Sequence, residues 1–118
     1  MKDWQRDAMA YDHDLANRVR EQLADQEAVT EKEMFGGIAF LLGGNMAVGV
    51  SRQELMVRVG KVGAHDALEQ EHTRPFDMTG RPMGGWVLVA QPGLAADPQL
   101  RAWVDRGVAF ARSLPAKG

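Results

Sequence analysis

Arginine, methionine and tryptophan side chains give this sequence its best candidates for binding chemistry. Arg81, Met83 and Trp86 lie in the glycine-rich stretch GRPMGGW at residues 80–86. These residue types are favoured in the cores of protein interfaces, so a loop that presents them together is a candidate contact surface. The alternative is an ordinary hairpin loop in which Trp86 is buried. If Arg58 lies nearby on the same sheet, Arg58 and Arg81 can form a small anion pocket, because guanidinium groups pair with carboxylates and phosphates.

Phe35, Gly36 and Gly37 open the most apolar part of the chain. Glycines let a backbone come close to a ligand, so one interpretation is a ligand-approach loop. The alternative is a bend or β-bulge at the start of a strand, with Phe35 packed in the core. The glycine spacing differs from that of a phosphate-binding loop, and no Lys-Ser or Lys-Thr pair follows.

The side chains that enzymes use for catalysis are present but not grouped. Cysteine is absent, which excludes thiol catalysis and thiolate zinc sites. Neither serine lies in a nucleophile elbow, and no two carboxylates share an apolar surrounding. His65, Glu69 and His72 share one face of an expected helix at residues 61–70, but the histidines are about 10 Å apart at a rise of 1.5 Å per residue. The sequence therefore predicts no catalytic site, no metal site and no cofactor.

Length and composition are those of a single globular domain. The 118 residues are 45% hydrophobic and 25% charged, and the net charge is −2. Proteins that bind nucleic acid usually carry a basic excess, so direct nucleic-acid binding is disfavoured. No apolar run approaches the ~20 residues of a membrane-spanning helix, and the N-terminus is no signal peptide. We expect a cytoplasmic protein with an N-terminal extension at residues 1–10 and one domain at residues 11–118.

Apolar periodicity and turn residues predict the elements that position these candidates. Helices are expected from Asp12 or Asp14, at residues 61–70, and from Asp97, an N-cap followed by Pro98. Strands are expected at residues 38–42, 46–50, 55–59, 76–79 and 86–90, with a turn at Gly43-Gly44-Asn45 between the first two. Residues 29–34 are a further candidate for a short edge strand. Gly107 interrupts the apolar stripe of the last helix, which predicts close backbone approach to a strand.

The predicted order is helix, three strands, helix, two strands, helix. Antiparallel hairpins with helices able to cover one face indicate a two-layer α+β sandwich. In the strand at residues 55–59, Leu55, Val57 and Val59 share one face, so Arg58 belongs to the other. That second face must be solvated or paired with another chain, which makes a homodimer one candidate assembly.

Several short motifs, in their order along the chain, resemble the TfoX N-terminal domain family. The likeness runs from about residue 9 to about residue 114. The motifs are Glu33-Met34-Phe35-Gly36-Gly37, Phe40, Gly44-Asn45-Met46-Ala47, Leu55-Met56-Val57-Arg58-Val59, Pro75-Phe76-Asp77-Met78, Gly80-Arg81-Pro82-Met83, Gly85-Trp86-Val87, and Trp103, Arg106, Gly107 and Phe110 of the last helix. The resemblance implies an α+β fold like that of secretion chaperones.

The name-giving members of that family are bacterial regulators of competence for DNA uptake, and they carry a second, C-terminal domain. This sequence has no counterpart of that domain, so we expect a single-domain member. The expected function is that of a non-enzymatic regulatory or protein-interaction module with an unidentified protein partner. The alternative is a domain that binds a small ligand or anion through Arg58 and Arg81.

Overall fold

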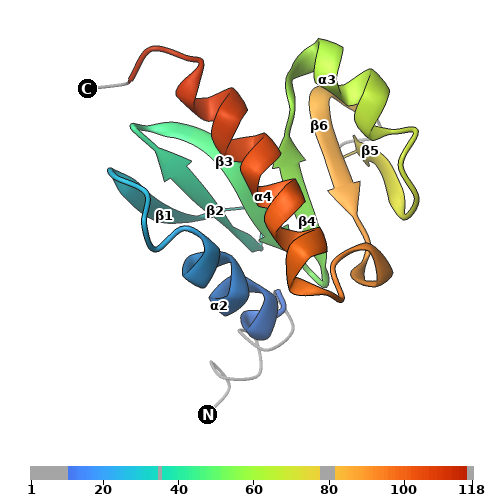
Figure 1. Ribbon diagram of the computed structural model, residues 1–118, viewed down its shortest axis with the longest axis horizontal. Helices are drawn as coiled ribbons and strands as arrows, with labels where there is room; N and C mark the ends of the chain where they lie inside the picture. The colour runs from blue at the N-terminus through green and yellow to red at the C-terminus, as the bar shows by residue number, and fades with distance from the viewer. Residues whose placement is uncertain (1–10, 35, 78–81, 117–118) are drawn as a thin grey trace.

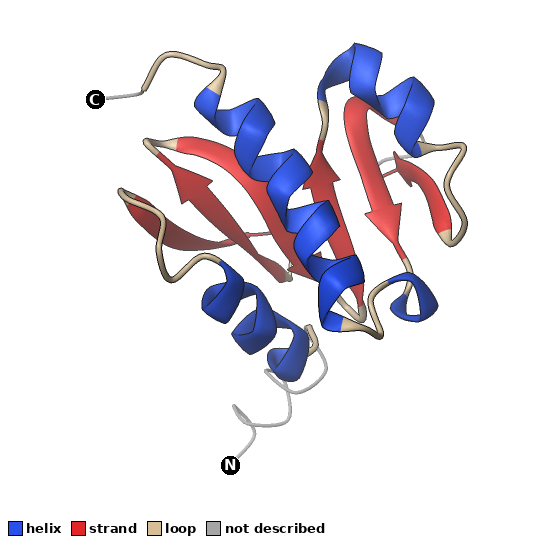
Figure 2. Cartoon of the chain, in the orientation of Figure 1, coloured by secondary structure: helices blue, strands red, loops and turns tan. Residues whose placement is uncertain are grey.

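The computed structural model describes residues 11–34, 36–77 and 82–116. Within these ranges, six strands form one antiparallel sheet and the helices lie against one of its faces (Figures 1 and 2). The strands are β1 (Val29–Met34), β2 (Gly37–Leu42), β3 (Asn45–Ser51), β4 (Glu54–Arg58), β5 (Thr73–Asp77) and β6 (Pro82–Val89). The helices are α2 (His13–Gln22), α3 (Gly60–Ala67), the 3-10 turn η1 (Gln91–Gly93) and α4 (Asp97–Arg112). The predicted α+β class is confirmed.

The strand order is β1-β2-β3-β4-β6-β5, so the second hairpin joins the meander through β6. The turn between β2 and β3 is the predicted glycine turn, with φ of +57° at Gly43 and +83° at Gly44. Asn45 then starts β3 and donates a hydrogen bond of 2.9 Å from its side-chain nitrogen to the carbonyl oxygen of Pro115. This bond ties the chain beyond α4 to the sheet, and no local pattern predicts it.

Helix α4 lies across the middle of the sheet, as Figure 1 shows. Its buried side chains include Leu100, Trp103 and Val104, which pack on the strands below. A Cβ at Gly107 would overlap the carbonyl oxygen of Ala47 in β3 and lie 2.6 Å from a methyl group of Val48. The predicted close approach of the helix to a strand at Gly107 is therefore confirmed.

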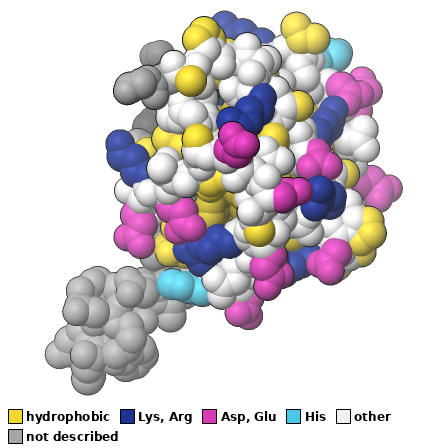
Figure 3. All heavy atoms as spheres, turned by 60° about the vertical axis from the view of Figure 1, so that its left-hand side comes forward, with side chains coloured by type: hydrophobic (Ala, Val, Ile, Leu, Met, Phe, Trp, Pro, Cys, Tyr) yellow, Lys and Arg dark blue, Asp and Glu magenta, His cyan; other side chains and the backbone are white. Residues whose placement is uncertain are grey.

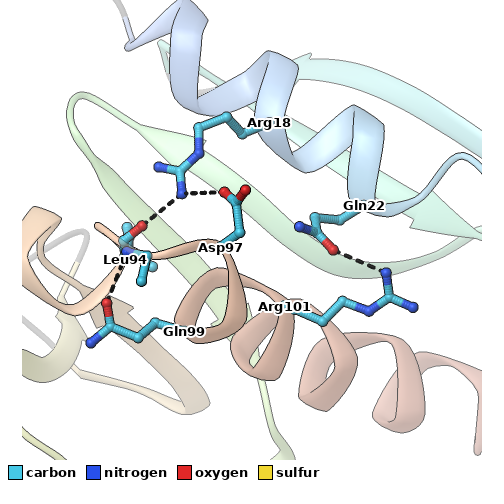
Figure 4. A network of polar contacts seen from close by, with 7 residues as sticks. Arg18, Gln22, Leu94, Asp97, Gln99 and Arg101 are labelled. Carbon is cyan, nitrogen blue, oxygen red and sulfur yellow. Dashed lines mark hydrogen bonds and ion pairs between the residues drawn. The ribbon is translucent and has the colours of Figure 1, made fainter.

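Helix α2 lies beside the first half of α4, and polar contacts join the two (Figure 4). Asp12 caps α2 as predicted, because its carboxylate accepts a hydrogen bond of 3.1 Å from the N–H of Leu15. Arg18 donates to the carbonyl oxygen of Leu94 at 2.9 Å and pairs with Asp97 at 3.1 Å. Helix α4 begins at Asp97, so its N-cap is Ala96 and not Asp97 as predicted.

Some element boundaries differ from the prediction because contacts with other elements set them, whereas the candidate edge strand does form. Residues Val29–Met34 do form an edge strand, because β2 offers them a complete register of partners. Helix α3 ends at Ala67, earlier than expected, and the hydroxyl of Thr73 donates to the carbonyl oxygen of Ala67 at 3.1 Å. Pro75 lies inside β5, where an edge strand tolerates a residue without an N–H.

The second hairpin also begins earlier than expected. Strand β6 starts at Pro82, so part of the predicted loop at residues 80–85 is strand. The pairing of β4 with β6 ends at Arg58 and Trp86. Pro82 precedes Trp86 in β6, so it has no partner in β4. A proline fits there because that part of β6 has no ladder bond to make on the β4 side. No helix within the described ranges is long and apolar enough to cross a membrane.

Candidate functional site

The face of the sheet opposite the helices carries a second apolar cluster. Met56, Trp86 and Leu88 form its buried part, and Met46 and Phe76 are half-buried beside them. The rings of Phe76 and Trp86 are tilted at 59°, with their centroids 6.0 Å apart. We call these five residues the open-face cluster, because none of the described helices lies over this side of the sheet.

Arg58 stands at one end of the open-face cluster. It is the last residue of β4, and it lies directly opposite Trp86 of β6. Its guanidinium carbon is 6.0 Å from the centre of the Trp86 ring and 5.3 Å from that of Phe110, which α4 brings to this corner. One of its terminal nitrogens donates to the carbonyl oxygen of Met46 at 3.4 Å. The two rings and the carbonyl group fix where the charged end of this side chain lies.

Arg58 has no carboxylate partner within the described part of the chain. Five other arginines there form ion pairs with aspartate or glutamate, namely Arg18, Arg20, Arg74, Arg101 and Arg106. Arg58 is nevertheless half-buried. A partly desolvated guanidinium without an anion is unfavourable unless a ligand supplies one. This arrangement can therefore accept a carboxylate or a phosphate.

The opposite end of the open-face cluster is closed by an ion pair. Arg74 of β5 reaches across β6 to Glu54 of β4, with its Nε 3.3 Å from one carboxylate oxygen and a terminal nitrogen on the other. Leu88 of β6 lies between the two strands at this point. The charges of Arg74 and Glu54 balance each other, so this end carries no unmatched charge.

The structure brings some of the predicted site residues together and separates others. Arg58 and Trp86 lie opposite each other on the adjacent strands β4 and β6, but the predicted anion pocket also requires Arg81. Trp86 is only 9% exposed, so its ring is buried in the hairpin rather than presented on a loop. Arg81 lies outside the described residues. Met83 belongs to β6, but its side chain lies outside the described part of the structure.

The glycines of the Phe-Gly-Gly motif have structural roles. Gly36, in the turn between β1 and β2, has a φ of +76° and open space where a side chain would project. Gly37 starts β2 opposite Met34, and a Cβ there would overlap the carbonyl oxygen of Val50. Phe35 itself lies outside the described residues. The placement of both glycines favours the bend at the start of a strand over a ligand loop.

Sequence patterns did not reveal an open hollow of about 1180 Å³ beside the start of α2. It is lined by Tyr11, Asp12, His13, Asp14, Arg52, Gln53, Glu54, Ala90, Gln91 and Pro92. Gln91 donates to the Asp12 carboxylate at 3.2 Å and to the carbonyl oxygen of Gln53 at 2.8 Å. Asp12 also caps α2, so these polar groups hold three segments together.

The pKa values of the two side chains in one ion pair are shifted from their ordinary values. Arg20 of α2 holds Glu31 of β1 through two hydrogen bonds, of 2.6 and 2.8 Å. These bonds lower the pKa of the Glu31 carboxyl and raise the pKa of the Arg20 guanidinium, although partial burial opposes both shifts. The pair lies on the face of the sheet that the helices cover, which we call the helix face. It joins a helix to an edge strand, so its role is structural.

The described residues contain no group of three or more histidine, aspartate or glutamate side chains placed to hold a metal ion. The helical face expected for His65, Glu69 and His72 does not form, because α3 ends at Ala67. His72 instead follows the helix with a φ of +67°. The three side chains therefore belong to a short helix and the turns after it.

Comparison with known proteins gives a family but no individual relative. The family described as the TfoX N-terminal domain matches residues 21–111, which include every described strand, the whole of α3 and nearly all of α4, but only the end of α2. Neither the curated proteins nor the solved structures provide a match to the chain.

Proposed function

Because this chain belongs to the TfoX N-terminal domain family, we propose that it is a non-enzymatic regulatory module that binds another protein. Regulation is the role that the family's name-giving members imply. We place the module in the bacterial cytoplasm, in keeping with a chain that lacks cysteine. The proposal draws its main support from one observation, the open-face cluster with Arg58 at its end.

The open-face cluster has the composition of an interface core. Methionine, tryptophan and arginine are enriched where proteins meet, and methionine adapts to partners of different shape. Met46 and Phe76 are the parts of the cluster that a partner can reach directly, since both are half-buried. Charged side chains of both signs cover the side of the molecule that carries β1, with some hydrophobic ones between them (Figure 3). That mixture gives no single-sign surface for nucleic acid there.

Replacement of an open-face residue tests the proposed function. Phe76→Lys places a charge on the cluster at a half-exposed position, whereas Val62→Lys places it on α3, where Val62 is 90% exposed. Immobilised wild type and V62K should retain the same proteins from a bacterial lysate, and F76K should retain about tenfold less of them. Circular dichroism checks that all three are folded. Equal retention by F76K and V62K would remove the open face from the proposal.

A second candidate function is binding of a small anion, which the unpaired guanidinium of Arg58 favours. A ligand that binds only the folded state at about a hundredfold excess over its Kd stabilises that state by about 2.7 kcal/mol. Thermal denaturation with phosphate, nucleotides or succinate should then raise Tm by about 5 °C or more. Arg58→Met should abolish the rise. If none of these anions changes Tm, this candidate is wrong.

A further inference from the structure

The described side chains of the open face are mostly basic, in a chain whose net charge is −2. The described charged side chains on this face are Lys32, Glu54, Arg58 and Arg74. They are assigned to it because, along each strand, they alternate with residues that face the helices. Arg74 and Glu54 form an ion pair, which leaves Lys32 and Arg58 unmatched. The face therefore combines an apolar cluster with uncompensated positive charge at its margins.

Arg58 is the better placed of these two cations for recognition. A guanidinium has five N–H donors in a fixed fork, and among the described residues one hydrogen bond, of 3.4 Å, occupies them. The rings of Phe110 and Trp86 limit the orientations of the side chain, so less freedom is lost when an anion binds. A carboxylate is the planar group that matches this fork with two parallel hydrogen bonds.

We infer that Arg58 receives a carboxylate from an apolar segment of a partner protein that lies over the open-face cluster. This inference rests on the proposed function and names the chemistry of the partner. The segment supplies hydrophobic side chains to Met46 and Phe76, and a glutamate, an aspartate or a chain terminus to Arg58.

A second copy of this chain is a poorer occupant of the same face. Two open faces brought together would join two surfaces on each of which the described cations Lys32 and Arg58 are unmatched. Glu54, the acidic side chain described on this face, is already engaged by Arg74. Like charges that meet in an interface oppose association, so the homodimer predicted from the sequence is disfavoured in this arrangement.

Self-pairing through the β1 edge of the sheet is disfavoured as well. If two copies paired their β1 strands antiparallel about a two-fold axis, the two sheets would form one larger sheet. The faces that the helices cover would then lie on the same side of it. Glu31 and Glu33 both belong to that face, because they lie opposite Phe40 and Ile38. Arg20 balances the charge of Glu31, but Glu33 forms no ion pair among the described residues, so a register that places Glu33 opposite a carboxylate of the second copy is destabilised.

A single-stranded nucleic acid is also a poorer occupant. Bases bind such proteins by stacking on exposed aromatic rings along a basic groove. Trp86 is only 9% exposed, and the described open face has two unmatched cations at separate places. A protein segment with a carboxylate uses both the apolar cluster and Arg58.

Matched synthetic peptides test the inference. We would use amphipathic peptides of about 15 residues, with leucines at helical or at alternate spacing, in pairs that differ only by glutamate or glutamine at one position. Fluorescence anisotropy at physiological salt gives the ratio of Kd values within each pair. The variants are Arg58→Met, which keeps an unbranched stem, and Arg52→Met as control, since Arg52 is exposed on the turn before β4.

Wild type and R52M should bind the glutamate peptide of at least one pair about tenfold more tightly than its glutamine partner. The R58M variant should bind both members equally, with an unchanged circular dichroism spectrum. Equal Kd values for both members of every binding pair on wild type would overturn the inference and leave the proposed function standing. Binding of no peptide would overturn both. Tighter binding of inorganic phosphate or of an oligonucleotide than of any peptide would also overturn the inference.

Discussion

The two faces of this sheet are built from the same strands but have different compositions. On the helix face, one row across the strands runs Glu31, Phe40, Val48, Val57, Val87 and Pro75, and its four central residues are fully buried. The neighbouring row on the open face runs Lys32, Ala39, Gly49, Met56, Leu88 and Arg74. The first row has branched and aromatic side chains that pack densely under helices. The second has small and flexible residues between charged ends.

This difference separates stability from recognition. Stiff β-branched side chains lose little freedom when they pack, so they suit a permanent core. Methionine is flexible and adapts to varied neighbours, so it suits a surface that meets a partner. The contrast leads us to expect larger stability losses from changes on the helix face and larger binding losses from changes on the open face.

Two phenylalanines on opposite faces give the largest expected contrast. Phe40→Ala should lower the free energy of unfolding by about 3–5 kcal/mol, because Phe40 is fully buried and leaves a cavity. Phe76→Ala should lower it by about 1 kcal/mol, because Phe76 is half-buried. Urea denaturation of both variants measures the difference. Equal losses would show that the open face is as much a core as the helix face.

A glycine-to-alanine change in α4 tests how closely the helix layer lies on the sheet. Alanine at a helix interior normally stabilises by about 1 kcal/mol relative to glycine. At Gly107 the added methyl group overlaps the carbonyl oxygen of Ala47, so we expect Gly107→Ala to destabilise by about 2 kcal/mol. Denaturation in urea gives the sign of the effect. A more stable G107A protein would contradict the close packing of α4 on β3.

The ion pair at the edge of the helix face should have a smaller effect. Glu31→Gln should lower stability at pH 7 by about 0.5 kcal/mol, because Glu31 and Arg20 are both more than a third exposed. Arg20 lowers the pKa of Glu31 from its ordinary 4.5, so the stabilisation is complete above that pH. It is lost as the pH falls through the lowered pKa.

Denaturation midpoints of wild type and E31Q between pH 7 and pH 2 should therefore converge at the acid end. Glu33→Gln is the control, since Glu33 lies on the same strand and face but forms no ion pair in the described structure. A difference between wild type and E31Q that stays constant with pH would exclude the ion pair as its source.

The smallest expected effect on stability comes from Arg58. Arg58→Met removes cation–π contacts worth about 0.5–1 kcal/mol, but it also removes a half-buried charge without an anion. These terms oppose each other, so we expect a change of about 0.5 kcal/mol or less in either direction. Thermal denaturation measures it. A loss of about 2 kcal/mol or more would identify Arg58 as a structural residue and weaken its role in binding.

Local chemistry was enough to predict the elements that depend on nearby residues. The Gly43-Gly44 turn, the Asp12 cap and the helix that contains Gly107 follow from the conformational freedom of glycine and the hydrogen bonds of a capping carboxylate. Boundaries set by distant partners were less predictable. Helix α3 was predicted too long, and β6 too short, because contacts with other strands define their ends.

The candidate site shows the same division. Alternation along residues 55–59 placed Arg58 on the face away from the helices, and the register of β4 and β6 confirms it. No pattern indicated that Phe110 of α4 would lie 5.3 Å from its guanidinium, or that no described carboxylate would pair with it. These facts depend on how α4 crosses the sheet.

The chain's periodicity fixed which residues share a strand face or a helix stripe, because side-chain direction follows from local backbone geometry. Tertiary packing decided how α4 crosses the sheet and which side chains meet at Arg58. Those outcomes depend on contacts between residues far apart in the chain, and such contacts leave no local signal. The binding surface proposed for this protein is therefore a product of its assembled layers.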